Sequence, residues 1–339
     1  MGSNPAGRTT LTCGAEPRLT LQPEPFVANT DQRWFDFLRS TSVGGVVDEV
    51  NFWSPVAQRP MRQMRPGEPM FFRLKRPRYA VAGYGFFAHF ALLELDVAWD
   101  TFGASNGFSD RSGFLEALGG WRQQGVAAMR SDGRKLACTI LRDAVFWPEE
   151  RWIPWGSERS WPPNVTQGTT VCDPVLADLL LREIQLDQHV PPEEFAPEFT
   201  LVAADEREIV SAQSRRRVGQ GAFRARLLTA YGSRCAISGE RTEPVLDAAH
   251  VQPYLGPRSN HIQNGLLLTK EFHALFDHGL VTVTPEYVVR VSPRIRDRWS
   301  NGKRYYDFHD RKLAVVPKDP RDKPSLDALG WHNLERFAS

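Results

Sequence analysis

The chain has 339 residues, and single cores stop growing near ~250 residues, so we expect two domains with connecting segments. Its hydrophobic (41%), aromatic (11%) and charged (24%) fractions are those of a soluble globular protein, and no apolar run approaches the roughly 18 residues of a membrane span. The formal net charge is only +2, so any signal for nucleic-acid binding must be local.

The N-terminal segment, residues 1–24, is rich in Gly, Pro and Thr, and we expect it to be disordered. It lacks the charged and apolar regions of a secretory signal, which favours a cytoplasmic protein. The four cysteines are far apart and form no C-x-x-C pair, which argues against a disulfide framework and against a four-cysteine zinc site. They are Cys13, Cys138, Cys172 and Cys235.

Residues 25–175 are dense in Trp, Phe and Gly, and they form the first expected domain. Three apolar runs of strand composition lie at residues 69–75, 79–95 and 135–147. Helices are expected at residues 30–40, where Thr30 is a candidate N-cap, and at 111–123. Short strands with glycine kinks predict a closed or nearly closed β-barrel with flanking helices.

Residues 176–214 form an expected acidic linker that contains one helix, at residues 175–186. We interpret this segment as a solvated connector rather than a cover for a basic surface. The charge then becomes basic at Arg215, Arg216 and Arg217, and a helical segment follows at 221–231. Residues 215–339 are therefore the second expected domain, and the chain as a whole is expected to be α+β.

The most informative region, residues 245–279, predicts the order strand, loop, strand, helix. His250 ends the first strand, Asn264 opens the second strand, and His273 lies on the helix, which Gly279 ends. A two-stranded hairpin packed on a helix is expected to bring these three side chains together.

Hydrolysis of a phosphodiester needs a base for the attacking water and a cation for the charge that develops on the phosphate. A neutral His suits the first task, and His with carboxylate suits the second. The residue types around this hairpin therefore indicate nuclease chemistry.

This region resembles the HNH (ββα-metal) endonucleases, in particular a group with five ordered motifs. The motifs lie at Gly219-Gln220 with Phe223-Arg224, Arg234-Cys235-Ala236 with Ser238-Gly239, Leu246 to His250, Asn264 to Leu268, and His273 to Asp277. The resemblance runs from about Arg217 to the C-terminus, and it implies a DNA endonuclease.

The resemblance also implies roles. His250 is the expected general base, Asn264 orients either His250 or the loop between the strands, and His273 is the metal ligand on the helix. Asp277 follows by four residues on the same helical face and is the expected second ligand.

The sequence departs from the commonest HNH pattern at two places. Ala249 stands where a ligating Asp or His is usual, and Asp247 lies on the same face of the strand, so Asp247 is expected to supply a carboxylate directly or through water. Ser238 stands where a second zinc-binding Cys would be, so we expect one metal and no structural zinc. Mg²⁺ or Mn²⁺ is favoured, although Zn²⁺ or Ni²⁺ could occupy the site in isolation.

Four arginines beside this site are expected to contact DNA phosphates, with a solvated face as the alternative. They are Arg215, Arg216, Arg217 and Arg224.

The first domain resembles the PUA-superfamily barrels, the group with the SRA, EVE and ASCH domains, which precede HNH domains in modification-dependent restriction enzymes. The shared element is G-E-P-x-F-F-x-L at residues 67–74. Such barrels flip a base out of the duplex, stack it between aromatic rings and read its edge. The candidate pocket residues are Trp53, Tyr84, Phe86 and Trp99 for stacking, with Asp48 and Asn51 for reading the edge.

The alternative for these aromatic residues is a place in the core of the barrel. A local basic concentration that suits phosphate contact consists of Arg59, Arg62, Arg65, Arg73, Lys75, Arg76 and Arg78.

We therefore predict a modification-dependent (type IV-like) restriction endonuclease that cuts double-stranded DNA near 5-methyl- or 5-hydroxymethylcytosine. One alternative is an HNH endonuclease that reads phosphorothioate or an unmodified sequence. Another is a DNA-binding protein whose HNH domain is inactive. Two nicks on opposite strands need two active sites, so a homodimer is expected.

Overall fold

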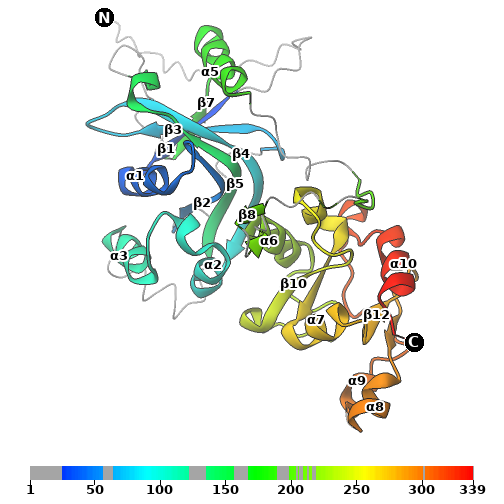
Figure 1. Ribbon diagram of the computed structural model, residues 1–339. Helices are drawn as coiled ribbons and strands as arrows, with labels where there is room; N and C mark the ends of the chain where they lie inside the picture. Colours follow the sequence, from blue (N-terminus) through cyan, green and yellow to red (C-terminus); the bar gives the residue numbers. More distant parts are fainter. Residues whose placement is uncertain are drawn as a thin grey trace, which may run out of the picture.

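The structure, a computed structural model, has an α+β fold, as expected. It describes residues 25–55, 64–121, 135–155, 167–188, 198–203, 205, 209–211, 214–215, 219–300 and 302–338. The N-terminal segment 1–24 and the predicted phosphate contacts Arg216 and Arg217 lie outside these residues. An N-terminal sheet with its helices lies beside a C-terminal group of hairpins and helices (Figure 1).

The N-terminal sheet has the strand order β2-β5-β4-β3-β1-β7, and β6 pairs with β4. The strands are β1 (Phe26–Thr30), β2 (Val46–Ser54), β3 (Pro69–Leu74), β4 (Ala80–Leu93), β5 (Leu136–Phe146), β6 (Ile153–Pro154) and β7 (Gly168–Thr170). β1 pairs with β3 in parallel, and the other pairs are antiparallel. The three predicted strand segments are confirmed as β3, β4 and β5.

The prediction was a closed or nearly closed barrel, and over the residues that the structure describes the sheet is not closed. β4 has register shifts between Tyr84 and Phe86 and between Phe87 and His89, and bulges of this kind bend a strand. Closure would also need hydrogen bonds between β2 and β7, and these two strands are the ends of the sheet path.

Core residues lie on both faces of this sheet. Helix α1 (Gln32–Thr41) packs on one face through Trp34, Phe35 and Leu38. Its N-cap is Asp31 rather than the predicted Thr30, because the Asp31 carboxylate accepts the amides of Arg33 and Trp34.

Helix α5 (Pro174–Asp187) packs on the opposite face through Leu176 and Leu180. Arg151, which precedes strand β6 of the sheet, forms ion pairs with Glu183 and Asp187 of this helix, each at 2.7 Å. The helix expected in the acidic linker is therefore attached to the N-terminal sheet and is not a free connector.

The C-terminal part is built around a hairpin and the helices that cover it. Its helices are α6 (Gln220–Ala230), α7 (Lys270–Asp277), α8 (Arg294–Trp299), α9 (Lys303–Tyr306) and α10 (Leu326–Glu335). Its strands are β10 (Leu246–His250), β11 (Gly265–Thr269), β12 (Val281–Val283) and β13 (Val289–Val291). A short ribbon, β8 (Ile209–Ser211) with β9 (Ser214–Arg215), precedes them.

The remaining helices of the first domain are α2 (Leu95–Phe102) and α3 (Arg111–Trp121). Both lie at one end of its sheet (Figure 1). Short 3-10 helices lie at Gly103–Asn106, Glu149–Arg151, Glu243–Val245, Pro257–Asn260, Ile262–Asn264 and Pro320–Asp322.

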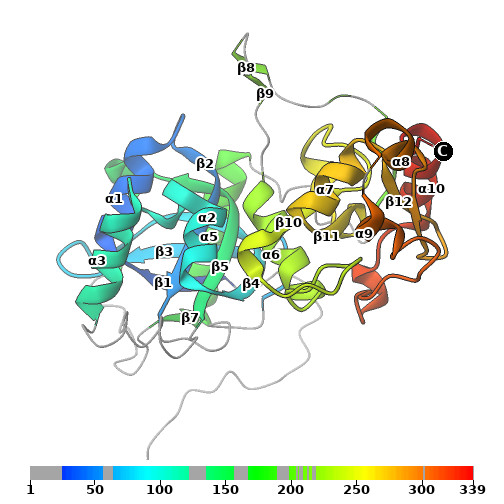
Figure 2. The ribbon, with the colours of Figure 1, turned by 90° about the horizontal axis from the view of Figure 1, so that it is seen from below.

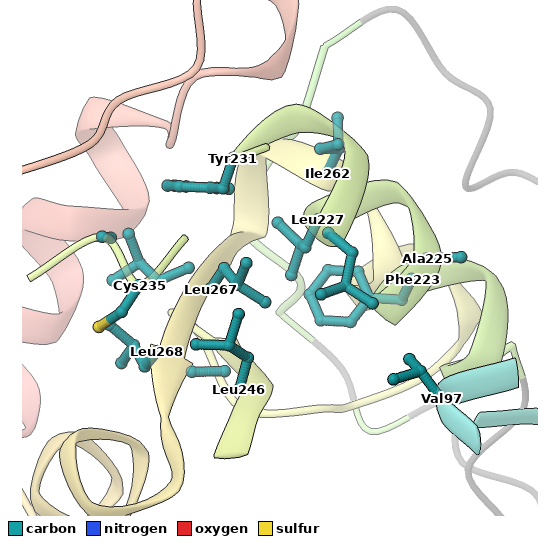
Figure 3. Packing of buried hydrophobic residues seen from close by; sticks show 14 of the residues in the cluster. Val97, Phe223, Ala225, Leu227, Tyr231, Cys235, Leu246, Ile262, Leu267 and Leu268 are labelled. Carbon is teal, nitrogen blue, oxygen red and sulfur yellow. The ribbon is translucent and has the colours of Figure 1, made fainter. Parts of the chain in front are cut away.

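Helix α6 lies between the N-terminal sheet and the β10–β11 hairpin (Figures 1 and 2). One cluster of buried side chains runs across this junction, from Val97 of α2 through Phe223 and Leu227 of α6 to Leu246 and Leu267 of the hairpin (Figure 3). The two parts are thus joined by a shared core as well as by the connecting chain.

Among the described residues, no helix has the length and apolar character needed to span a membrane. Cys138 and Cys235 are buried free thiols, whereas Cys172 is disulfide-bonded, which the cysteine spacing did not predict.

Gly279, which ends α7 as predicted, should not tolerate a side chain. Its φ is +66°, and a Cβ atom would overlap the carbonyl oxygen of Arg336. Strained backbone conformations of this kind cost on the order of 1–3 kcal/mol, and overpacking costs a further ~1–3 kcal/mol. Gly279→Ala is therefore expected to lower the free energy of unfolding by both amounts, as measured by urea denaturation.

Gly232→Ala is the matched control, because Gly232 has a φ of +61° and a Cβ atom there would meet nothing within 4 Å. The free energy of unfolding of Gly232→Ala should fall only by the cost of the strained backbone. Equal decreases in the free energy of unfolding of the two variants would contradict the close approach of the Arg336 carbonyl to Gly279.

Candidate active site

The β10–β11 hairpin supplies the first part of the site, in the predicted order strand, loop, strand, helix. β10 pairs antiparallel to β11, with Asp247 opposite Leu268 and His250 opposite Gly265. α7 begins directly after β11. Because side chains alternate along a strand, Asp247 lies on one face of β10 and His250 on the other.

Three predicted metal ligands meet around one imidazole ring on the α7 side of the hairpin. His273 Nδ1 lies 2.9 Å from Asp247 Oδ2, and His273 Nε2 lies 3.4 Å from Asp277 Oδ2. The structure therefore brings all three together, as strand alternation and the four-residue helical spacing predict.

Asp247 has an environment that favours its ionised form. Burial alone would raise the pKa of its carboxyl group, but the hydrogen bond and charge of His273, the amide of Ala248 and the charge of Arg224 lower it, and the net pKa lies below the usual value. The Arg224 Nη1–Asp247 Oδ1 distance is 3.2 Å. Asp247 thus offers anionic oxygen atoms as metal ligands, and several neighbouring groups hold its carboxylate in place.

The donor types of this cluster fit one divalent cation. Imidazole nitrogen and carboxylate oxygen are common ligands of divalent metals. Over the described part of the chain, no group of three or more His, Cys, Asp or Glu side chains is already arranged around a metal position. Since each carboxylate faces a different nitrogen of His273, the ring can offer one nitrogen to a metal and keep a carboxylate on the other as an orienting partner.

His250, the candidate general base, lies on the α6 side of the hairpin. Its ring stacks on Phe223 of α6 at a centroid distance of 4.2 Å and meets the edge of Tyr254 at 5.8 Å. Its Nε2 lies 3.1 Å from Asn260 Oδ1. An amide oxygen only accepts hydrogen bonds, so Nε2 carries the proton in this contact and Nδ1 is the basic nitrogen of the neutral ring.

The sequence led us to expect His250, Asn264 and His273 at one point, and in the structure each of the two histidines has its own set of contacts. His273 is in contact with Asp247 and Asp277, whereas His250 is in contact with Asn260 and the rings of Phe223 and Tyr254. Regular alternation along β10 puts the side chains of Asp247 and His250 on opposite faces of the strand, because their positions differ by an odd number.

Asn264 is fully buried and organises the loop between the two strands. Its Oδ1 accepts the amide of Gln252 (2.8 Å), and its Nδ2 donates to the carbonyl groups of Gln252 (3.0 Å) and Ser259 (2.9 Å). Of the two roles that the resemblance implies for Asn264, these contacts support the one that shapes the loop.

The structure gives little support to phosphate contact by Arg224. Its guanidinium donates to the carbonyl of Leu246 (2.6 Å), to Asp247 and to Thr101 of α2 (3.3 Å), and its side chain is only 16% exposed. Arg224 therefore joins the two domains beside Asp247. Arg215 lies in β9, and its side chain lies outside the described part of the structure.

Two of the predicted base-pocket residues meet in the structure, one of them buried and the other, Trp53, partly buried. Asn51 and Trp53 lie on the same face of β2, and each bonds to Asn106 at 2.9 Å, through Asn51 Nδ2 and Trp53 Nε1. Asn51 is fully buried, and the Trp53 ring packs on Phe114.

The other candidate pocket residues lie elsewhere. Tyr84 and Phe86 are buried in the core cluster beneath α5, and Trp99 packs beside Phe114. The backbone carbonyl of Asp48 accepts Nε of Arg142 (2.8 Å). These positions favour the alternative in which most of the aromatic residues are core.

The predicted basic concentration of the first domain is only partly on the surface. Arg73 is buried against Asn29, and Arg78 pairs with Asp36 at 2.7 Å. Exposed members are Arg65, Lys75 and Arg76, and Arg59 and Arg62 lie outside the described residues.

The surroundings of His250 include three residues for which no role was predicted. Phe223 stacks on its ring, Asn260 contacts its Nε2, and Gln220 bonds to Asn260. The available signal was the motif G-Q-x-x-F-R, which contains Gln220 and Phe223. Asn260 belongs to none of the motifs.

A family described as HNH endonuclease matches residues 235–284 of the chain, a range that includes the whole hairpin and α7. This segment is an HNH endonuclease domain. The enzyme class predicted from the sequence, a DNA endonuclease, is thereby confirmed. HNH nucleases generally use a divalent metal, in agreement with the donor types around His273.

No curated protein has a significant sequence match to the chain. Among solved structures, an ASCH protein from Zymomonas mobilis is 12% identical, with a TM-score of 0.32, and covers 47% of this chain and 94% of its own. A structure described as the modification-dependent TagI restriction endonuclease is 13% identical, with a TM-score of 0.23, and covers 84% of this chain and 74% of its own.

Proposed function

We propose that this HNH endonuclease is a modification-dependent restriction enzyme. Its N-terminal domain reads 5-methyl- or 5-hydroxymethylcytosine in double-stranded DNA, and its HNH domain hydrolyses a phosphodiester bond nearby. The observation that carries the nuclease part is the Asp247–His273–Asp277 cluster, which lies within the segment that matches the HNH family.

The side chains of the HNH domain divide the chemistry between them. His250 takes a proton from the attacking water at Nδ1, while Asn260 holds the opposite ring nitrogen. His273 and one of the two carboxylates would hold Mg²⁺ or Mn²⁺, and the ion would stabilise the charge that develops on the phosphate. Asn264 keeps the loop between the strands in place.

Two features support a reading role for the N-terminal domain. Its sequence resembles PUA-superfamily sensor domains, and its exposed residues Arg65, Lys75 and Arg76 suit contact with phosphates. Asn51 is buried and Trp53 is partly buried, and both bond to Asn106, so a flipped base can reach both only if the α2–α3 region moves.

The test compares plasmids with and without modified cytosine, using the full chain and Mg²⁺. We expect cleavage of the modified plasmid to be faster by about 5- to 150-fold, the rate ratio that corresponds to the ~1–3 kcal/mol lost with a set of base-edge contacts. Equal rates on both plasmids would reject modification dependence and leave an endonuclease that reads unmodified sequence. Cleavage only of phosphorothioate DNA would show that the enzyme recognises a modification of the DNA backbone and not a modified base.

We also propose that the enzyme acts as a homodimer in the cytoplasm, since a double-strand break needs two nuclease centres. Sedimentation of the His250→Ala variant on a short modified duplex should show two chains per duplex. A single chain per duplex, together with nicked rather than linear product from the wild-type enzyme, would contradict the dimer.

A further inference from the structure

We propose that Asn260 is a positioning residue for His250, and that Glu49 of the N-terminal sheet fixes the helix that supports Asn260. The nuclease centre is then completed by a residue of the other domain. This inference rests on the proposed function, in which His250 is the general base.

Asn260 lies between His250 and helix α6. Its side chain is buried, with the residue 1% exposed, and its Oδ1 accepts both His250 Nε2 (3.1 Å) and Gln220 Nε2 (3.0 Å). Because an amide oxygen cannot donate, this contact selects the ring form with the proton on Nε2 and the basic lone pair on Nδ1. Gln220 in turn fixes the position of that oxygen.

Helix α6 sets the orientation of the His250 ring in a second way. Phe223, one turn after Gln220, stacks on the imidazole with an interplanar angle of 13°. A shift of α6 would therefore move both supports of His250 together, the amide contact through Gln220 and the stacked ring.

The N-terminus of α6 is held by the first domain. Its N-cap residue is Gly219, which has no side chain to accept the free amides of the first turn. Glu49 of β2 takes this place, because its Oε2 accepts the amide of Ala222 at 2.7 Å. A carboxylate at the start of a helix is also favoured by the helix dipole.

Two glycines allow this close approach. A Cβ atom at Gly221 would overlap Glu49 Oε1, and one at Gly219 would overlap the guanidinium of Arg142, a buried residue of β5. The same Cβ would also lie 2.9 Å from Asn260 Nδ2. Gly219 has a φ of +77°, a conformation that favours glycine. The start of α6 is therefore confined between the N-terminal sheet and the loop that carries Asn260.

These contacts form a continuous path from β2 through α6 to the imidazole. The motif G-Q-x-x-F-R supplies its parts: Gly219 for the approach, Gln220 for Asn260 and Phe223 for the ring. Arg224 of the same motif lies outside this path and contacts Asp247. A residue on this path should affect the rate of the chemical step more than the affinity for DNA, because none of its atoms needs to touch the substrate.

The test measures single-turnover cleavage rates and DNA dissociation constants for variants of the full chain. Asn260→Leu should lower the rate by about tenfold or more, as outer-shell partners of catalytic groups typically do, and should leave the dissociation constant within about twofold. Asn260→Asp keeps an acceptor oxygen and should restore most of the rate. Gln220→Met, at a partly exposed position, removes only the bond to Asn260 and should give an intermediate loss even if Asn260→Leu does not fold.

Glu49→Ala should also lower the rate with unchanged affinity. Its matched control is Glu243→Ala, because Glu243 also bridges the domains, to Lys135 at 2.7 Å, through an ion pair that does not involve α6. Thermal unfolding of both variants reports their effect on the junction itself.

Rates of Asn260→Leu and Gln220→Met within about twofold of wild type would overturn the inference if His250→Ala is inactive. Equal rate losses in Glu49→Ala and Glu243→Ala would also overturn the part assigned to Glu49. If His250→Ala itself still cleaves DNA, the assignment of the general base fails, which is a separate result.

Discussion

The His250→Ala variant is expected to lose DNA cleavage and to keep nearly unchanged affinity for DNA. A positioned general base contributes ~10²-fold or more to the rate, whereas an imidazole that activates water makes little ground-state contact with the substrate. Single-turnover cleavage with Mg²⁺ gives the rate, and fluorescence anisotropy in EDTA gives the affinity.

His278→Ala is a suitable control within the same domain. His278 is exposed at the end of α7, and its Nδ1 contacts the carbonyl of Ala274 in the same helix. Because His250 packs on Phe223, thermal unfolding must show that His250→Ala remains folded. A folded variant that retains more than about a tenth of the wild-type rate would remove His250 from the role of base.

The second large effect is expected from the metal ligands. His273→Ala should weaken binding of Mn²⁺ and lower the cleavage rate by ~10–100-fold or more at a fixed metal concentration, because it removes the group that both carboxylates contact. Isothermal titration calorimetry with Mn²⁺ measures the affinity directly. Cleavage should stop in EDTA and return with Mg²⁺ or Mn²⁺.

The two carboxylates should not contribute equally. The Asp247 side chain is 39% exposed and is also held by Arg224 and the amide of Ala248, whereas the Asp277 side chain is 56% exposed. We expect Asp247→Asn to weaken Mn²⁺ binding more than Asp277→Asn does. Unchanged metal affinity in both variants would show that neither carboxylate belongs to the site.

Much of the HNH site follows from the sequence, because its geometry is local. Alternation along β10 puts Asp247 on one face, and the four-residue spacing of His273 and Asp277 puts them on one side of α7. Both relations hold in the structure. Local pattern therefore sufficed for the three candidate ligands.

The same alternation also places His250 on the other face of the hairpin, which the family motif did not indicate. The partners of His250 come from a loop and from α6, and Glu49 reaches α6 from a strand far away in the sequence. Contacts between distant segments depend on how the domains pack, and no local pattern encodes that packing.

The N-terminal sheet shows the same limit. Its strand segments were predictable from composition, but its open path depends on which strands become its edges. Asn51 and Trp53 share a face of β2, as alternation predicts. Asn106 and Phe114 cover that face, and they belong to helices more than 50 residues further along the chain, so the pattern of β2 alone could not predict the contact.

Cleavage of cytosine-modified plasmid by the purified full chain in Mg²⁺, followed alongside the unmodified plasmid and the His250→Ala variant, is the sharpest test of the proposed function. We expect nicked and linear products from the modified plasmid with the wild-type chain, and intact plasmid with the variant. Intact modified plasmid with the wild-type chain in both Mg²⁺ and Mn²⁺, or equal cleavage by the variant, would rule that function out.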